Sequence, residues 1–117
     1  MTPSSQPNAK QKRWREAVRE LGSVISGGPA VIHHPVGRTA KHNKVEIGHW
    51  WVLPLTDQEH KDLHNGLTPW SRVYLREGRK EFEKWAFRQV LFRLRILDGS
   101  ENWPTDEAIF AIEDYRR

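Results

Sequence analysis

The chain has 117 residues and no cysteine, and its 19 lysines and arginines exceed its 15 aspartates and glutamates. This length fits one small domain, and the lack of cysteine excludes disulfide bonds and thiolate metal sites. No apolar run is long enough for a signal peptide or a membrane span, so we expect a soluble, cytoplasmic protein without a membrane partner. The formal net charge of +4 favours a polyanionic partner such as nucleic acid.

The N-terminal part predicts a disordered arm followed by a helix. Residues 1–8 contain two prolines and two serines and no apolar pattern, which is typical of a disordered arm outside the core. Residues 9–21 carry apolar side chains at helical spacing, namely Trp14, Ala17, Val18 and Leu21. Gly22 follows as a stop signal, so we expect a first helix over 9–21.

Two strands and a helix are expected in the middle of the chain. Residues 30–34 form a short β-branched run and residues 49–55 a second apolar run, so both are predicted strands. The polar residues 36–48 between them predict a long loop. Thr56 starts an S/T-x-x-E capping box, which predicts a helix that ends with a left-handed cap at Gly66.

Helices dominate the C-terminal part of the predicted fold. Residues 71–76 predict a short helix or turn that ends before Gly78. Residues 79–97 predict the longest helix, because apolar side chains alternate there with Arg and Lys at helical spacing. A last short helix is expected over 105–115, and the fold class is therefore α+β.

Four histidines are the most informative feature of the sequence. His60 and His64 are four residues apart, so the predicted helix places both imidazoles on one face. Two neutral imidazoles can share one divalent ion if a third ligand reaches them, and the pair His33-His34 on the first predicted strand is the obvious source. A His-x-x-x-His pair alone is more often without a metal, but the strand, strand, helix order favours a metal site between strands and helix.

An ordered set of segments in this sequence is similar to one protein family. The segments are Val31-Ile32-His33-His34, Gly37-Arg38 with Lys41, residues 49–55, Glu59-His60 with Leu63-His64, and residues 78–83. They cover about half of the chain and resemble the HNH, or ββα-metal, endonucleases, most of all the phage recombination-enhancement (Ref-like) nucleases. The resemblance implies a single HNH-type domain over 9–117, with a ββα-metal core at about 30–66 and C-terminal helices at about 71–117.

The chain departs from the family in two places. Members usually carry two Cys-x-x-Cys pairs that form a zinc knuckle, and the corresponding positions here are Ser23, Ser26, Thr56 and Glu59. We therefore expect no knuckle metal, and expect its role to pass to apolar packing by Trp14, Trp50, Trp51 and Leu55. At the place of the middle Asn of the HNH pattern the chain has His49, with Asn43 in the loop as the less favoured substitute.

The resemblance also implies a role for each candidate residue. One divalent ion, Zn²⁺, Mg²⁺ or Mn²⁺, is expected as a Lewis acid on the imidazoles of His33, His60 and His64. The catalytic candidates are His34 as general base and His49 as the group that orients it. Phosphates of DNA are expected to contact three cations of the predicted loop, Arg38, Lys41 and Lys44.

The expected function is hydrolysis of phosphodiester bonds in DNA by a metal-dependent, phage-type endonuclease. The resemblance alone implies branched or single-stranded recombination intermediates as substrates, a recombinase as partner and the host-cell cytoplasm as location. A second hypothesis is a catalytically silent nucleic-acid-binding protein with a structural metal, and a third is a protein-interaction module with incidental histidines. The choice between DNA and RNA and the oligomeric state stay open at this point.

Overall fold

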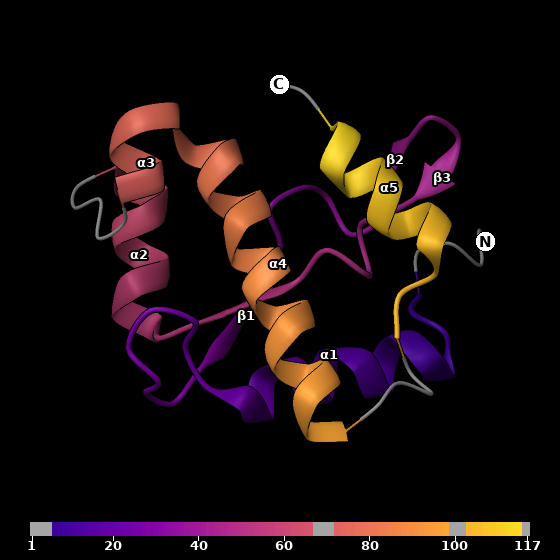
Figure 1. Cartoon of the computed structure of the whole chain (residues 1–117), viewed down its shortest axis with the longest axis horizontal. Helices are drawn as coiled ribbons and strands as arrows, with labels where there is room; N and C mark the ends of the chain where they lie inside the picture. Colours follow the sequence, from indigo (N-terminus) through magenta and orange to yellow (C-terminus); the bar gives the residue numbers. More distant parts are fainter. Residues whose placement is uncertain (1–5, 67–71, 99–102, 116–117) are drawn as a thin grey trace.

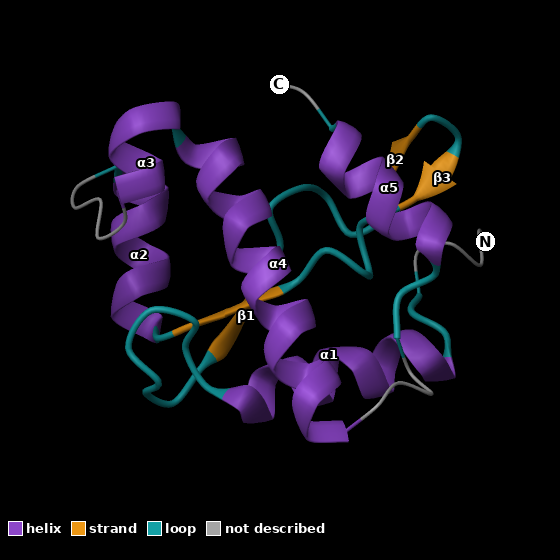
Figure 2. Cartoon of the chain, viewed as in Figure 1, coloured by secondary structure: helices purple, strands orange, loops and turns teal. Residues whose placement is uncertain are grey.

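The computed structural model of the chain describes residues 6–66, 72–98 and 103–115, which form an α+β fold. The helices are α1 (Ala9–Leu21), α2 (Asp57–Asn65), α3 (Arg72–Glu77), α4 (Arg79–Asp98) and α5 (Asp106–Asp114). The strands are β1 (Val31–His33), β2 (Lys41–His42), β3 (Val45–Glu46) and β4 (Leu53–Leu55). Helix α4 runs through the middle, with α2 and α3 on one side and α5 with the β2–β3 hairpin on the other (Figure 1). Figure 2 shows how short the strands are beside the helices.

Helix α1 has the predicted bounds because local signals fix both of its ends. The side chain of Asn8 accepts a hydrogen bond from the backbone N–H of Gln11 at 2.8 Å, and the Gln11 side chain accepts one from the N–H of Asn8 at 2.8 Å. The helix ends at Gly22, whose φ of 87° favours glycine. Of the predicted disordered arm, residues 1–5 lie outside the described residues, whereas Asn8 is the cap of the helix.

Strands β1 and β4 lie within the two predicted strands, but each is only three residues long. They pair antiparallel, with His33 opposite Leu53. All of β4 is buried, whereas β1 changes from exposed Val31 to buried His33 along its length. The pairing therefore holds His33 against a fully buried strand.

The second predicted strand, residues 49–55, is wrong in its first half. The carbonyl of Ile47 accepts the backbone N–H groups of Trp50 and Trp51, at 3.1 and 2.8 Å, so the chain turns there before β4 begins. His49 consequently lies in a turn and not beside a strand partner. An apolar run of this kind fits a buried turn as well as a strand.

A small hairpin occupies part of the predicted loop, which is a second correction. Strands β2 and β3 are joined by Asn43 and Lys44, with φ angles of 54° and 66°. Positive φ at both central residues is the pattern of a type I′ turn, whose twist matches that of a hairpin. Lysine is uncommon in this conformation, so Asn43 and Lys44 are only a weak sequence signal for the turn.

Helix α2 follows β4 directly and has the predicted bounds. The Thr56 hydroxyl accepts the backbone N–H of Glu59 at 3.1 Å, and the Glu59 carboxylate accepts the N–H of Thr56 at 2.9 Å. This capping box is worth about 1 kcal/mol to the helix. Gly66 closes the helix in the left-handed conformation, with φ 63° and ψ 26°, as predicted. Buried Leu63 anchors the helix to the core.

The C-terminal helices cover the strands and α1. Helices α4 and α5 lie within a residue of their predicted bounds, and α3 begins at Arg72, while Ser71 of its predicted range lies outside the described residues. Large buried side chains from all parts of the fold form the core: Trp14, Trp51, Leu53, Leu55, Phe82, Phe87, Val90 and Ile112. Buried Lys84 donates a hydrogen bond to the carbonyl of Glu113 at 3.0 Å and so ties the end of α5 to α4. Within the described ranges no helix is long and apolar enough to cross a membrane.

Candidate metal centre

Three of the predicted ligands converge. His33, at the end of β1, and His60 and His64, on α2, each offer a ring nitrogen, and these nitrogens lie within 4.8 Å of one another. The Nε2 atoms of His60 and His64 are 3.1 Å apart, so the two helical rings point to the same place. His33 is buried and His64 exposed, which leaves the cluster open to solvent on the α2 side. The i, i+4 spacing and the β1–β4 pairing therefore produce the cluster that the sequence predicted.

The His33 ring is held by a residue that the sequence analysis gave no role. The Nε2–H group of His33 donates to Oε2 of Glu83 on α4 at 2.6 Å, and both side chains are fully buried. Glu83 also accepts hydrogen bonds from Lys80 at 2.9 Å and from Arg79 at 3.4 Å. Burial acts to raise the pKa of Glu83, but the hydrogen bonds from His33 and Lys80 outweigh it and lower the pKa, so the group is a carboxylate.

The other ring nitrogen of His33, Nδ1, is buried and has a lone pair that no described residue uses. A carboxylate only accepts, so the hydrogen of a neutral His33 ring must sit on Nε2, and Nδ1 keeps its lone pair. That Nδ1 atom is buried and finds no hydrogen-bond partner among the described residues. A buried polar atom without a partner costs about 1–3 kcal/mol. A bound ion would remove this cost.

The helical histidines are in the chemical form that binds metal. Burial, followed by the effect of His33, lowers the pKa of both His60 and His64, which keeps their rings neutral near pH 7. Neutral imidazole is the form that binds a divalent ion. The protonation state therefore agrees with the geometry.

His34, the candidate base, lies next to the cluster and is partly buried. Burial, followed by the charges of Arg38 and other nearby groups, lowers its pKa to about 4. Its Nε2 atom is buried without a hydrogen-bond partner in the described part of the chain. His49 is buried and near enough to affect His34 electrostatically, although it reaches this place from a turn. Arg15 of α1 also acts electrostatically on His34, an effect that the sequence analysis missed.

The three predicted DNA-binding cations lie in two different local structures. Arg38 is exposed and acts on His34, but Lys41 and Lys44 belong to the β2–β3 hairpin. That hairpin lies beside α5, across α4 from α2 (Figure 1). Arg79 of α4, which the sequence analysis did not single out, acts electrostatically on both helical histidines and lowers their pKa. Such an effect depends on tertiary packing and leaves no local signal in the sequence.

Asn43, the less favoured substitute for the middle Asn, belongs to the same distant hairpin, as does His42, for which no chemical role was predicted. His42 and Asn43 each donate a hydrogen bond to the carboxylate of Asp114 on α5, at 3.1 and 2.9 Å. Asn43 is thus turned toward α5, which argues against it as the substitute for the middle Asn. These contacts fasten the hairpin to the C-terminal helix.

The four positions where the resemblance predicts the loss of a zinc knuckle are joined by hydrogen bonds. The Ser23 hydroxyl donates to Oε1 of Glu59 at 2.5 Å, and the same oxygen accepts the backbone N–H of Thr56. The backbone N–H groups of Ile25 and Ser26 donate to Oγ of Ser23 at 3.0 and 3.1 Å. The aromatic and aliphatic residues expected to pack nearby are all buried: Trp14, Trp50, Trp51 and Leu55. The loop before β1 is therefore fastened to the start of α2 by a polar network as well as by apolar packing.

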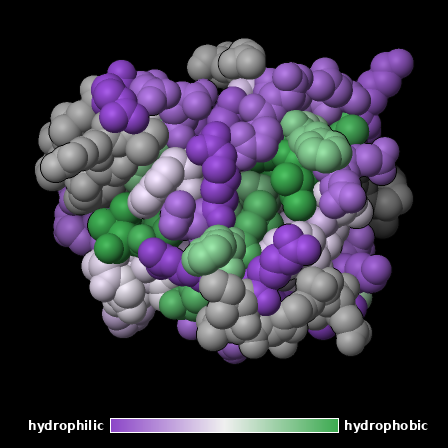
Figure 3. Space-filling model, in the orientation of Figure 1, coloured by the Kyte–Doolittle hydropathy of each residue, from purple (hydrophilic) through white to green (hydrophobic). Residues whose placement is uncertain are grey.

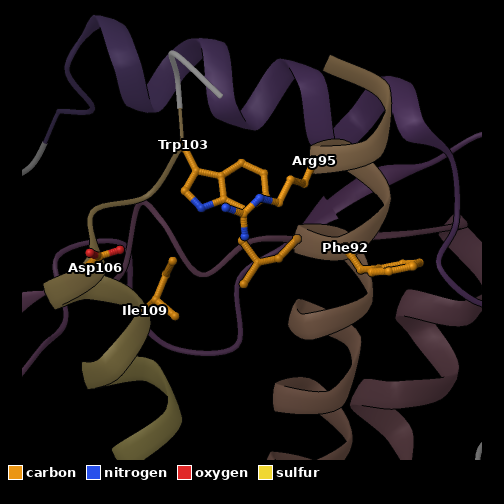
Figure 4. A pocket seen from close by; sticks show the side chains of 6 residues that line it. Phe92, Arg95, Trp103, Asp106 and Ile109 are labelled. Atoms are coloured by element: carbon orange, nitrogen blue, oxygen red, sulfur yellow. The ribbon is translucent and has the colours of Figure 1, made fainter. Parts of the chain in front are cut away.

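One pocket lies away from the histidines, between α4 and α5. It has a volume of about 370 Å³ and is lined by Leu91, Phe92, Arg95, Trp103, Asp106 and Ile109. Figure 4 shows the guanidinium of Arg95 over the indole of Trp103, 6.0 Å from the ring centre, while Phe92 points away from both. On the same face, hydrophobic residues appear as separate patches broken by hydrophilic ones (Figure 3). The pocket holds none of the metal-binding candidates.

The donor atoms of the histidine cluster fit a divalent transition metal. Tetrahedral Zn²⁺ with three imidazoles needs nitrogens roughly 3.3 Å apart, and small rotations of the rings can supply this because the nitrogens already lie within 4.8 Å of one another. Imidazole ligands suit Zn²⁺ better than Mg²⁺, and the unpartnered Nδ1 of His33 is a ready donor. Comparisons of the chain with protein-family models, with curated proteins and with solved structures found no match.

Proposed function

We propose that this protein is a metal-dependent DNA endonuclease with a ββα-metal core formed by β1, β4 and α2. The observation that carries the proposal is the convergence of His33, His60 and His64 beside His34. The order of these residues along the chain is that of the HNH resemblance. Branched or single-stranded recombination intermediates, the substrates that this resemblance implies, belong to the proposal, as does action with a recombinase in a host-cell cytoplasm.

Each nearby side chain has a task in such a reaction. The bound ion would supply Lewis-acid stabilisation of the charge on the phosphate. His34 takes the proton from the attacking water, and His49 holds the His34 ring in place. Arg38 and Arg79 stabilise the negative charge of the phosphates on either side of the bond that breaks. The arginines thus bind the phosphates of the substrate, and the histidines bind the metal and transfer the proton.

One observation favours the second function, a catalytically silent nucleic-acid-binding protein with a structural metal. The pKa of His34 is lowered to about 4, which makes the ring a weak base unless substrate changes its surroundings. In that protein the ion would brace β1 against α2. Replacement of His34 would then leave nucleic-acid binding unchanged.

The deciding experiment is cleavage of supercoiled plasmid and of single-stranded DNA with Mg²⁺, Mn²⁺, Zn²⁺ or EDTA. We expect metal-dependent nicking by the wild type, a loss of at least about 100-fold in His34→Ala, and no change in His42→Ala. His42 is the matched control because it lies on the distant hairpin, where its side chain binds Asp114 of α5. If neither the wild type nor the variants cut under any ion while all bind DNA, the endonuclease is excluded and the silent binding protein stands.

A further inference from the structure

We infer that Glu83 is a positioning residue of the metal centre, which keeps the hydrogen of the His33 ring on Nε2 and so presents Nδ1 to the ion. The inference rests on the proposed function only in requiring that His33, His60 and His64 bind a metal. Glu83 would determine which nitrogen of His33 binds the ion and how the ring is oriented. Helix α4 would therefore take part in the metal centre.

The contact has the geometry that this role requires. The His33–Glu83 hydrogen bond is short, 2.6 Å, and neither side chain is exposed, so water does not compete for it. Since a carboxylate accepts but does not donate, the bond fixes the hydrogen on Nε2. An imidazole that donates to a carboxylate is also a more basic ligand through its other nitrogen.

The neighbouring lysine strengthens the same arrangement. Lys80, one turn before Glu83 on α4, donates to the second carboxylate oxygen at 2.9 Å and to the backbone carbonyl of Pro35 at 2.8 Å. Hydrogen bonds from α4 therefore hold the end of β1 at two places, at His33 through Glu83 and at Pro35 through Lys80. Two contacts two residues apart leave the His33 ring little freedom to turn.

A stabilising ion pair alone does not account for this arrangement. Burying a carboxylate and its partners costs free energy that an apolar residue of the same volume would not incur. A His–Glu pair with no further task would also need a partner for Nδ1, yet Nδ1 is buried without one in the described residues. Ligation of an ion by Nδ1 explains the bare nitrogen and the buried carboxylate together.

The test compares Glu83→Gln with Glu81→Gln in the full chain. Glu81 is the matched control, because it lies on the same helix but pairs with Lys84 instead of a histidine. Zn²⁺ affinity is measured by titration calorimetry, and the protein is checked for folding by circular dichroism. We expect Glu83→Gln to weaken Zn²⁺ binding roughly 10–100-fold and Glu81→Gln to leave it unchanged. Unchanged affinity in folded Glu83→Gln would overturn the inference.

A second measurement needs no variant. Long-range ¹H–¹⁵N correlation spectra of the ion-free wild type report which nitrogen of His33 carries the hydrogen, and we expect Nε2. Hydrogen on Nδ1 would overturn the inference even if Glu83→Gln failed to fold. A wild type that binds no ion would remove the metal centre and the inference together. If the wild type binds Zn²⁺, depends on Glu83 for this affinity and cuts no DNA, only the proposal of an endonuclease would be refuted.

Discussion

Gly48 offers the sharpest test of the segment that carries Arg38 and His49. A Cβ atom at position 48 would lie 2.2 Å from the carbonyl oxygens of both Gly37 and Arg38. Non-bonded carbon contacts lie at roughly 3.5 Å, so the overlap exceeds 1 Å at two places. Both obstructing atoms belong to the backbone, which cannot rotate away as a side chain would. We therefore expect Gly48→Ala to displace one of the two chain segments.

The expected cost can be estimated from this overlap. Overpacked substitutions usually cost 1–3 kcal/mol, and a clash with two carbonyls belongs at the upper end, about 3 kcal/mol. For a domain of this size that corresponds to a melting temperature lower by roughly 10–15 °C. The two backbone hydrogen bonds that Ala40 accepts from Ile47 and Gly48, at 3.0 and 3.2 Å, would be strained as well.

Gly37→Ala is the matched control for this experiment. A Cβ atom there would meet nothing within 4 Å, and Gly37 does not have a positive φ. We expect its melting temperature to stay near that of the wild type or rise slightly. Thermal unfolding followed by circular dichroism measures both variants, and equal melting temperatures for Gly48→Ala and Gly37→Ala would refute the reasoning.

Three further predictions concern the centre and its support. Ser23→Ala removes the hydroxyl that binds buried Glu59 and accepts two backbone N–H groups, so urea unfolding should show a loss of about 2 kcal/mol, and no loss would contradict the network. The pKa of His34 is lowered from 6.5 to about 4, so the unfolded chain binds more protons between these values and stability falls as pH drops from 6.5 toward 4. After allowance for solvent screening we expect about 1–2 kcal/mol from this group, seen as a shallower pH dependence of unfolding in His34→Ala. Zn²⁺ at about 100 times its Kd should stabilise the wild type by about 2.7 kcal/mol in thermal unfolding, and His60→Ala, but not His42→Ala, should abolish the gain.

The sequence predicted most accurately the parts of the fold that local signals determine. Helices α1 and α2 have the expected bounds because caps at Asn8 and Thr56 and glycines at 22 and 66 end them within their own segments. The convergence of His60 and His64 follows from helical spacing alone. The meeting of His33 with them was also predictable, since it needs only the order strand, strand, helix.

The parts that depend on tertiary packing could not be foreseen in the same way. His49 lies in a turn because the carbonyl of Ile47 accepts hydrogen bonds from the backbone N–H groups of Trp50 and Trp51. An apolar run in the sequence does not predict these hydrogen bonds. Glu83 is 50 residues from His33 in sequence, so its place depends on how α4 crosses β1. Lys44 has a left-handed backbone conformation, which favours glycine. Because the turn has lysine at this position, the sequence did not indicate the hairpin.

The burial of the Lys84 amine makes it possible to follow the opening of α5 by chemical labelling. Its side chain is 3% exposed, whereas that of Lys61 on α2 is 63% exposed. An acylating reagent reaches the Lys84 amine only when α5 lifts from α4 and releases it from the carbonyl of Glu113. The rate of acylation at Lys84, divided by that at Lys61, therefore reports how often the last helix of the described fold opens.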